Sequence, residues 1–445
     1  MKYHNSQGFN NFRFPTEFWL ICTIVGLGFV YGFNIGFYSF RMVDLILVLT
    51  IMYFIFRNKS KDNSKLILFY SLLVIYLFVL TVLDFENYSH LLYAKTQFGM
   101  LMTYLTPIIY IHVRETYIDI SIAKKLLIIA FIISILSQFG ILTWGESEAS
   151  GVADLGLFLN LGTSMRKYGE IIKYQERTIT IWRALIIGAS FALIFVKTKP
   201  MLKIIGISSL FLQIAGGGGG RGGLVFVVVT PIIFFFLLND DKKIKIIKKI
   251  SVAFAISAFF ASIYILAPLG QKYVTKDNIL VTHQDRSEEI LVLFTGGWDE
   301  ASRIGGFNAR TMGYEEYINR IFSDWFIFLF GVGLYKGVGF VYTANQGAHN
   351  MILDIWSLVG IIGLFFFIVF QYYILKDLIN ILRIKNISNN SKVMLYSFAI
   401  ALIYFYTPLL FQAVTSDRSF MIVYYLIAGT LRPLSKSITE KKLEV

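Results

Sequence analysis

The sequence is poor in cysteine and in charged residues. Its single cysteine is Cys22, so a disulfide within the chain is impossible and a cysteine-based metal site is excluded. Charged residues make up 16% of the 445 residues, whereas a soluble domain carries roughly 25%. This scarcity of charge argues against a soluble globular protein.

Apolar residues dominate instead, at 56% of the chain, and aromatic residues make up 17%. They come in blocks of about 17–25 residues, the length of helix that crosses the hydrocarbon core of a bilayer. The sequence therefore predicts an all-α polytopic membrane protein with about twelve transmembrane helices. These predicted spans lie at roughly 18–36, 40–56, 66–83, 92–113, 126–143, 178–196, 201–216, 222–238, 250–267, 350–375, 393–412 and 418–431.

Positive charge alternates between the connectors of these apolar blocks. One set of connectors holds most of the Lys and Arg residues, whereas the short connectors of the other set hold only Arg41, Arg221 and Arg418. The positive-inside rule assigns the Lys-rich set to the cytoplasm, so both termini are expected to be cytoplasmic and the number of helices even. The formal net charge of +13 then reflects topology and affinity for anionic headgroups, and no nucleic acid is expected as a partner.

Two predicted outer segments are long, at roughly 144–177 and 269–349. The larger one is too long for a simple connector and is expected to carry function. Its apolar runs Ile290–Phe294 and Trp325–Phe330 predict short amphipathic helices at the membrane interface. The rest of the chain is expected to form a single transmembrane domain.

A glycine run marks the outer end of the predicted span 201–216. Gly216–Gly220 are followed by Arg221 and Gly222, and each glycine in a helix costs about 1 kcal/mol relative to Ala. The first helix should fray there, and the next should begin near Gly222 with its N-terminus on the outer face. The free N–H groups of that end and the Arg221 guanidinium would suit a phosphate. The alternative is that the glycines allow close helix packing and Arg221 reaches lipid headgroups.

A histidine stands where the larger outer segment ends. His349 and Asn350 open the predicted span 350–375, so His349 is expected at the outer N-terminus of an inward-running helix. Asn350 and Asp354 are four residues apart, which places them on one helix face. The helix dipole would keep the imidazole neutral, and a neutral imidazole could take a proton from a sugar hydroxyl. The alternative is an ordinary interfacial histidine.

Two arginines flank the outer start of the predicted span 178–196. They are Arg177 and Arg183, and Arg183 falls inside the apolar block. A charge in such a place is expensive and is usually functional or paired. If it is only paired, Asp44 or Asp354 could be its partner.

These groups share one expected position. In the predicted topology the helices after Arg177, Arg221 and His349 all begin at the outer surface, where they could form one cationic cavity for a lipid-linked pyrophosphate. The larger outer segment could cover that cavity. Since no Cys/His pattern exists and acids are sparse nearby, a reaction without a metal is the simpler hypothesis.

Several of these residues resemble the signature of a known family, the O-antigen polymerase (Wzy) and O-antigen ligase superfamily. Arg320 and Trp325 are similar to the Arg and aromatic positions in the large periplasmic loop of that family. Gly220-Arg221-Gly222 is similar to its turn of a small residue and Arg, with Gly220 in place of the usual Ser. The remaining matches are Gly331, Val332, Gly333, His349, Asn350, Gly360 and Gly363.

The resemblance implies an inverting glycosyl transfer on the periplasmic face of the bacterial inner membrane. The donor would be a growing glycan on undecaprenyl pyrophosphate, and the acceptor a sugar hydroxyl of the next lipid-linked repeat unit. His349 would be the general base, and Arg221, Arg320 and either Arg177 or Arg183 would neutralise the leaving pyrophosphate. The other residues expected to bind pyrophosphate or glycan are Asn350, Gly220 and Gly222.

The same resemblance leaves other functions open. No cofactor or metal would be needed, and membrane lipids and a chain-length regulator are expected partners. An O-antigen ligase, which moves finished glycan onto lipid A core, carries the same motifs, although length and composition favour a polymerase. A twelve-helix flippase or transporter is the rival from another class. The long outer segment, the lack of an internal repeat and the few mid-span charges count against it.

Overall fold

The computed structural model describes a subset of the chain. The described residues are 32–35, 38–41, 47–48, 52, 64–83, 101–115, 121, 123–125, 127–128, 131–132, 142–146, 155–159, 184–215, 220–238, 317–319, 321–333, 350–384, 387–411 and 418–443.

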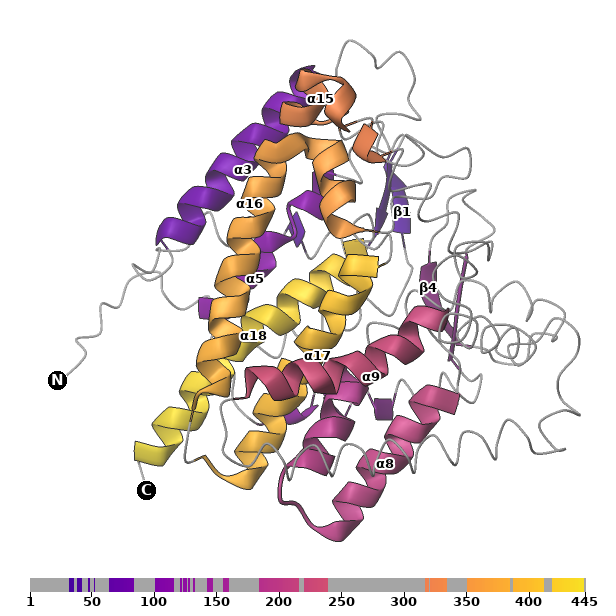
Figure 1. The fold of residues 1–445 in the computed structure, drawn as a ribbon, viewed down its shortest axis with the longest axis vertical. Coiled ribbons are helices and arrows are strands. Elements are labelled where there is room, and N and C mark those ends of the chain that lie inside the picture. The colour runs from indigo at the N-terminus through magenta and orange to yellow at the C-terminus, as the bar shows by residue number, and fades with distance from the viewer. Residues whose placement is uncertain are drawn as a thin grey trace, which may run out of the picture.

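Helices make up most of these residues (Figure 1). One helix spans Ala184–Phe195. Apart from two short hairpins, the helical fold class is therefore confirmed for the part of the chain that the structure describes. The labelled helices are α3 (Ser64–Leu83), α5 (Pro107–Glu115), α8 (Pro200–Ala215), α9 (Gly220–Leu237), α15 (Trp325–Phe330), α16 (Met351–Leu382), α17 (Asn389–Phe411) and α18 (Arg418–Leu443).

The two hairpins correct the prediction of continuous helix in the first third of the chain. Strand β1 (Gly32–Ile35) pairs antiparallel with β2 (Tyr38–Arg41), where the predicted spans 18–36 and 40–56 meet. Two residues separate these strands and the first is Gly36, a connection that favours a tight hairpin. Strand β3 (Leu142–Glu146) pairs with β4 (Leu155–Leu159) at the end of the span 126–143 and in the smaller outer segment.

Hydropathy located most of the later helices to within a few residues. The spans predicted at 66–83, 201–216 and 222–238 correspond to α3, α8 and α9. The short helix predicted at Trp325–Phe330 is α15. The span 250–267 lies outside the described residues, so the number of twelve spans and the cytoplasmic placement of both termini stay predictions.

Two predicted spans have different bounds for local reasons. The span 92–113 is interrupted by a turn at 105–106, after which α5 begins at Pro107, because proline suits the first position of a helix and disrupts its interior. Helix α18 continues well past the predicted end at 431. Its last turns are polar, but Leu434 and Ile438 are buried, so an amphipathic face extends the helix beyond the apolar block.

Two of the described helices, α3 and α16, are long and apolar enough to cross a membrane. They run side by side (Figure 1), and Phe365 of α16 packs edge-on against Phe69 of α3. The opposite side of α3 is apolar and exposed, with Ile75 at 59% and Phe78 at 66% of full exposure. An apolar helix that leaves such residues uncovered is suited to contact with lipid.

Close helix approaches hold the rest of the bundle together. A Cβ atom on Gly188 would overlap the carbonyl oxygen of Ser397 in α17, and a Cβ on Gly429 of α18 would lie 2.9 Å from the Cβ of Val113 in α5. Small residues allow helix backbones to approach in this way. The largest fully buried side chains are Tyr110, Tyr317, Tyr404, Tyr424, Tyr425, Phe191, Phe234, Phe370, Phe398, Phe405 and Phe420.

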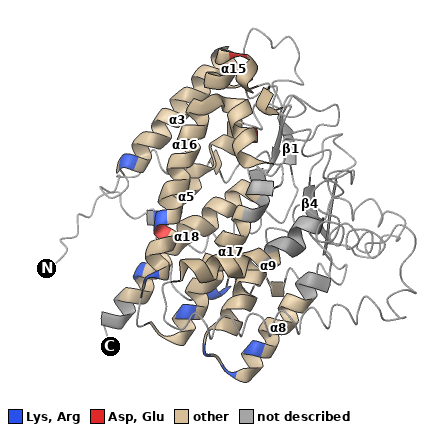
Figure 2. Cartoon of the chain, viewed as in Figure 1, with Lys and Arg blue, Asp and Glu red and all other residues tan. Residues whose placement is uncertain are grey.

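Charge is distributed unevenly over the described elements. Figure 2 shows that the Lys and Arg positions lie away from α15 and from the adjoining ends of α3 and α16. The acidic residue drawn at the α15 end is Asp324, which caps α15 through a hydrogen bond from the Phe326 amide. Within the described residues this arrangement agrees with the charge alternation from which the topology was predicted.

A buried ion pair joins α5 to α16 and was not predicted. The Arg114 guanidinium donates to both carboxylate oxygens of Asp377, at 2.6 Å and 3.1 Å, and the Tyr110 hydroxyl donates to the same carboxylate at 2.8 Å. The two charged side chains are only 8% and 7% exposed. Burial alone lowers the pKa of Arg114, but its interactions with Asp377 and Tyr110 outweigh burial and raise this pKa above its ordinary value, so Arg114 keeps its charge.

We expect Asp377→Ala to destabilise the folded protein by about 3–5 kcal/mol, because the buried Arg114 guanidinium loses its carboxylate. Lys376→Ala is the matched control, since Lys376 is the exposed neighbour on the same helix, and it should change stability by less than about 0.5 kcal/mol. Equilibrium unfolding in detergent micelles measures both values. Equal stability of the two variants would show that the pair does not hold α5 to α16.

Candidate functional site

The structure describes some of the predicted site residues and not others. His349, Arg320, Arg177 and Arg183 lie outside the described residues. Gly220, Arg221 and Gly222 form the first turn of α9, and Asn350 is the N-cap of α16. The described part of the predicted site therefore consists of the start of α9 and of the unit formed by α15 and α16.

The glycine run separates two helices, as predicted. Helix α8 ends at Ala215, immediately before Gly216, and α9 begins at Gly220. The new helix thus starts two residues earlier than the predicted Gly222, so Arg221 belongs to its first turn. Backbone N–H groups in the first turn of a helix lack intrahelical partners and favour anions. The place where this helix starts is close to the predicted one, and anion binding there stays a prediction.

Asn350 organises the start of α16. Its side-chain oxygen accepts hydrogen bonds from the backbone N–H groups of Ile352, at 3.0 Å, and Leu353, at 3.3 Å. Its backbone is extended, with φ −142° and ψ 118°, as is usual for an N-cap. Asp354 follows in the first turn and is buried. Asn350 therefore has a structural role besides the binding role that the sequence suggested.

Helix α16 is broken at Gly360, where the sequence predicts one straight helix. Gly360 has φ 65° and ψ −176°, so the helix consists of two legs, residues 351–359 and residues 361–382. The two legs form an inverted V with α15 at its apex (Figure 1). A glycine can adopt this backbone conformation at no steric cost, which a hydropathy pattern does not register.

The residues 331–333 cap the end of the first leg. The backbone N–H of Val332 donates to the carbonyl of Ser357 at 2.8 Å, and that of Gly333 donates to the carbonyl of Leu358 at 3.1 Å. The last four carbonyls of any helix lack intrahelical partners. This segment, which we call the 331–333 cap, satisfies two of them.

Side chains complete the cap. The Tyr76 hydroxyl of α3 donates to the carbonyl of Val359 at 2.7 Å, so a third free carbonyl of the first leg is satisfied. The indole N–H of Trp356 donates to the carbonyl of Phe328 in α15 at 3.1 Å. Trp356 also packs edge-on against Phe322, with ring centroids 5.5 Å apart. The apex of the V is therefore tied to α15 and to α3.

Two glycines are required where the cap meets the break. Gly331 has φ 76°, and a Cβ there would overlap the carbonyl of Leu358. A Cβ on Gly360 would overlap the carbonyl of Leu329. Both the positive φ and the close backbone approach exclude other residues. The glycines that carry the family resemblance thus have a physical reason to be glycine.

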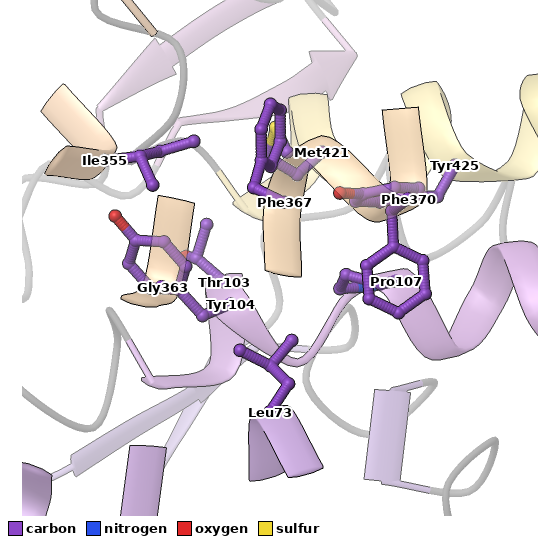
Figure 3. Close-up of a pocket in the computed structure, with 10 residues that line it drawn as sticks. All are labelled: Leu73, Thr103, Tyr104, Pro107, Ile355, Gly363, Phe367, Phe370, Met421 and Tyr425. Carbon is purple, nitrogen blue, oxygen red and sulfur yellow. The ribbon is translucent and has the colours of Figure 1, made fainter. Parts of the chain in front are cut away.

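A cavity lies between the two legs of α16 (Figure 3). Its volume is about 20 Å³, and a single water molecule needs about 10–15 Å³ on this measure. It is therefore too small for a sugar or a pyrophosphate and is not a substrate site. Its lining residues are Leu73, Thr103, Tyr104, Pro107, Ile355, Gly363, Phe367, Phe370, Met421 and Tyr425.

A buried amide links three helices and was also missed by sequence reasoning. The Gln371 side-chain oxygen in α16 accepts hydrogen bonds from the hydroxyl of Tyr406 in α17, at 3.0 Å, and from that of Tyr424 in α18. Gln371 is 8% exposed. A lone glutamine inside an apolar block could have indicated this network, because a buried amide requires hydrogen-bond partners.

Known protein families and curated proteins supply no relative for this arrangement. No model of a known protein family matches the chain, and no curated protein matches it. The resemblance described above therefore depends on the named residues alone.

We expect Asn350→Ala to destabilise the protein by about 1 kcal/mol, because two N–H groups of the first leg lose their acceptor. Asn350→Ser keeps a neutral acceptor at the N-cap and should retain wild-type stability. Unfolding of the two purified variants in detergent compares them. If Asn350→Ala were as stable as wild type, the N-cap would not be what fixes the start of this leg.

Proposed function

We propose that this chain is a glycosyltransferase of the bacterial inner membrane that polymerises the repeat units of a surface polysaccharide. It would transfer the growing glycan from undecaprenyl pyrophosphate to the next lipid-linked repeat unit on the periplasmic side. The single observation that carries the proposal is the packing of residues 331–333 on the leg that Asn350 opens. Two separate parts of the sequence signature thus belong to one structural unit.

Three further observations support a membrane location. Helices α3 and α16 are long and apolar enough to cross a bilayer. The uncovered face of α3 repeats at helical spacing through Leu68, Leu72, Ile75, Val79 and Val82, all exposed, over about 21 Å of helix. The positive charges of the described elements lie away from α15 (Figure 2). Lipid contact explains such an apolar face without a protein partner.

The chemistry follows from the residue types in the signature. A sugar hydroxyl of the acceptor attacks the anomeric carbon of the donor, the bond from that carbon to the pyrophosphate oxygen breaks, and His349 takes the hydroxyl proton. The leaving undecaprenyl pyrophosphate gains negative charge. Arg221 and Arg320, with Arg177 or Arg183, would stabilise that charge, and the first turn of α9 would contribute its N–H groups.

We expect His349→Ala to abolish transfer while the protein is still inserted, because the acceptor hydroxyl loses its base. A gel of surface glycan from a deletion strain, complemented with each variant, measures this. His283→Ala is the matched control, since His283 lies in the same outer segment, and it should restore a full ladder.

The same gel separates the alternatives. A single repeat unit on the lipid core in the deletion strain supports a polymerase. A bare core with long chains left on undecaprenyl pyrophosphate would instead identify a ligase, and a normal ladder from His349→Ala would contradict the assigned base.

We expect Arg221→Ala to lower donor affinity and turnover together, by about tenfold or more in kcat/KM, since a charge-assisted contact to pyrophosphate contributes roughly 1.5–3 kcal/mol. Arg221→Lys keeps the positive charge but not the bidentate geometry. Its kcat/KM should therefore lie between that of the wild type and that of Arg221→Ala. Purified protein with lipid-linked repeat units provides the kinetics. Wild-type values for Arg221→Ala would instead favour packing and lipid contact as the role of this turn.

A further inference from the structure

The two legs of α16 differ in length, and therefore in whether they can cross a bilayer. At 1.5 Å per residue, the first leg (351–359) is about 13 Å long and the second leg (361–382) about 33 Å. A bilayer core is about 30 Å thick. Only the second leg can cross it, and the first leg must start and end on the same side or within the layer.

The shared cavity shows that the legs lie beside each other. Ile355 from the first leg and Phe370 from the second line the same small cavity (Figure 3). These residues are fifteen positions apart, which is about 22 Å along a straight helix. Their meeting around a cavity of one-water size therefore requires the chain to fold back at Gly360.

In the predicted topology the apex of the V is at the outer end. It is tied to α15 by the 331–333 cap, and the Lys and Arg positions of the described elements lie away from it (Figure 2). From this apex the first leg runs back into the bundle, and its residues Met351, Asp354 and Ile355 are at most 5% exposed. Asn350 is at its inner end.

We infer that residues 351–359 form a re-entrant helix, and that Gly331 and Gly360 are positioning residues that set its depth. The inference rests on the proposed function for the membrane and its outer side. It places Asn350 up to about 13 Å below the apex, within the lipid layer rather than on the outer surface. A group at that level acts on a substrate that arrives in the plane of the membrane, such as a lipid-linked pyrophosphate, and not on a soluble glycan.

The free backbone groups at both ends of the first leg have protein partners. The Asn350 side-chain oxygen accepts from Ile352 and Leu353 at the deep end, and the 331–333 cap donates at the apex. Backbone groups at membrane depth must be satisfied by protein, because lipid offers no hydrogen bonds. The carbonyls of Ser357, Leu358 and Val359 have lost their helical donors at the break and regain donors from Val332, Gly333 and Tyr76. A straight helix would need none of these contacts.

Spin-label distances test the fold of α16. In a Cys22→Ala background, nitroxide labels replace Ile352 and Tyr372, which are both exposed. A straight helix places these positions about 30 Å apart, whereas two legs at a right angle or less bring them within about 22 Å. The control pair is Phe365 on the second leg and Arg383, the C-cap of that leg, which should be about 27 Å apart in either case. A distance near 30 Å for the first pair overturns the inference.

Collision measurements on the same labels test depth in lipid vesicles. A label at residue 352 should collide with dissolved oxygen more than with a water-soluble nickel chelate, and a label at residue 324 should show the reverse. Water-like behaviour at both positions overturns the placement in the lipid layer. Neither readout depends on catalysis, so the distances test the re-entrant helix and the glycan ladder tests the proposed reaction. An active His349→Ala protein that keeps these distances would refute the reaction alone, and an inactive one with a distance near 30 Å would refute the re-entrant helix alone.

A final variant tests Gly360 as a positioning residue. Gly360→Ala should shift or broaden the distance between residues 352 and 372 and reduce the glycan ladder, while the control distance on the second leg stays unchanged. An unchanged distance between residues 352 and 372 in this variant would show that Gly360 does not set the depth of the leg.

Discussion

The capped break at Gly360 is the interaction on which the described architecture depends. An apolar helix that stops inside a bundle leaves carbonyl groups without donors, and in an apolar environment each such group costs about 1–3 kcal/mol or more. The N–H groups of residues 331–333 and the Tyr76 hydroxyl meet this requirement from two other parts of the chain. The positions of α15, α3 and both legs of α16 are thereby coupled.

Two other buried polar clusters also join helices. The Arg114 and Asp377 charges pair with each other, and the Gln371 oxygen accepts from two tyrosines. Each of these contacts joins different helices. In a bundle where apolar packing alone distinguishes poorly between helix arrangements, such directional contacts select one register. They are therefore constraints on the arrangement of helices as well as sources of stability.

Hydropathy predicted the helices that are simple apolar blocks, namely α3, α8 and α9, and the glycine run correctly separated the last two. It failed where a single residue changes the backbone. Gly360 lies in an unbroken apolar run, so the break in α16 has no signature in average hydropathy, and Pro107 divides a second predicted span. The site was predicted less completely, because the Gly331 and Gly360 motif indicated a family without indicating that these residues meet.

Breaking a long apolar helix is costly, and the structure suggests why the cost is tolerated. Glycine in a helix is less favourable than alanine by about 1 kcal/mol, and an alanine at residue 360 would allow one uninterrupted helix from Met351 to Leu382. Residues whose local conformational preference opposes the simplest fold are expected at functional positions. The break lies between Asn350 and the long second leg, so its direct effect is to decide where the start of the first leg lies. Since the resemblance assigns the reacting base to the residue before Asn350, the backbone conformation of Gly360 determines the depth at which that chemistry would occur.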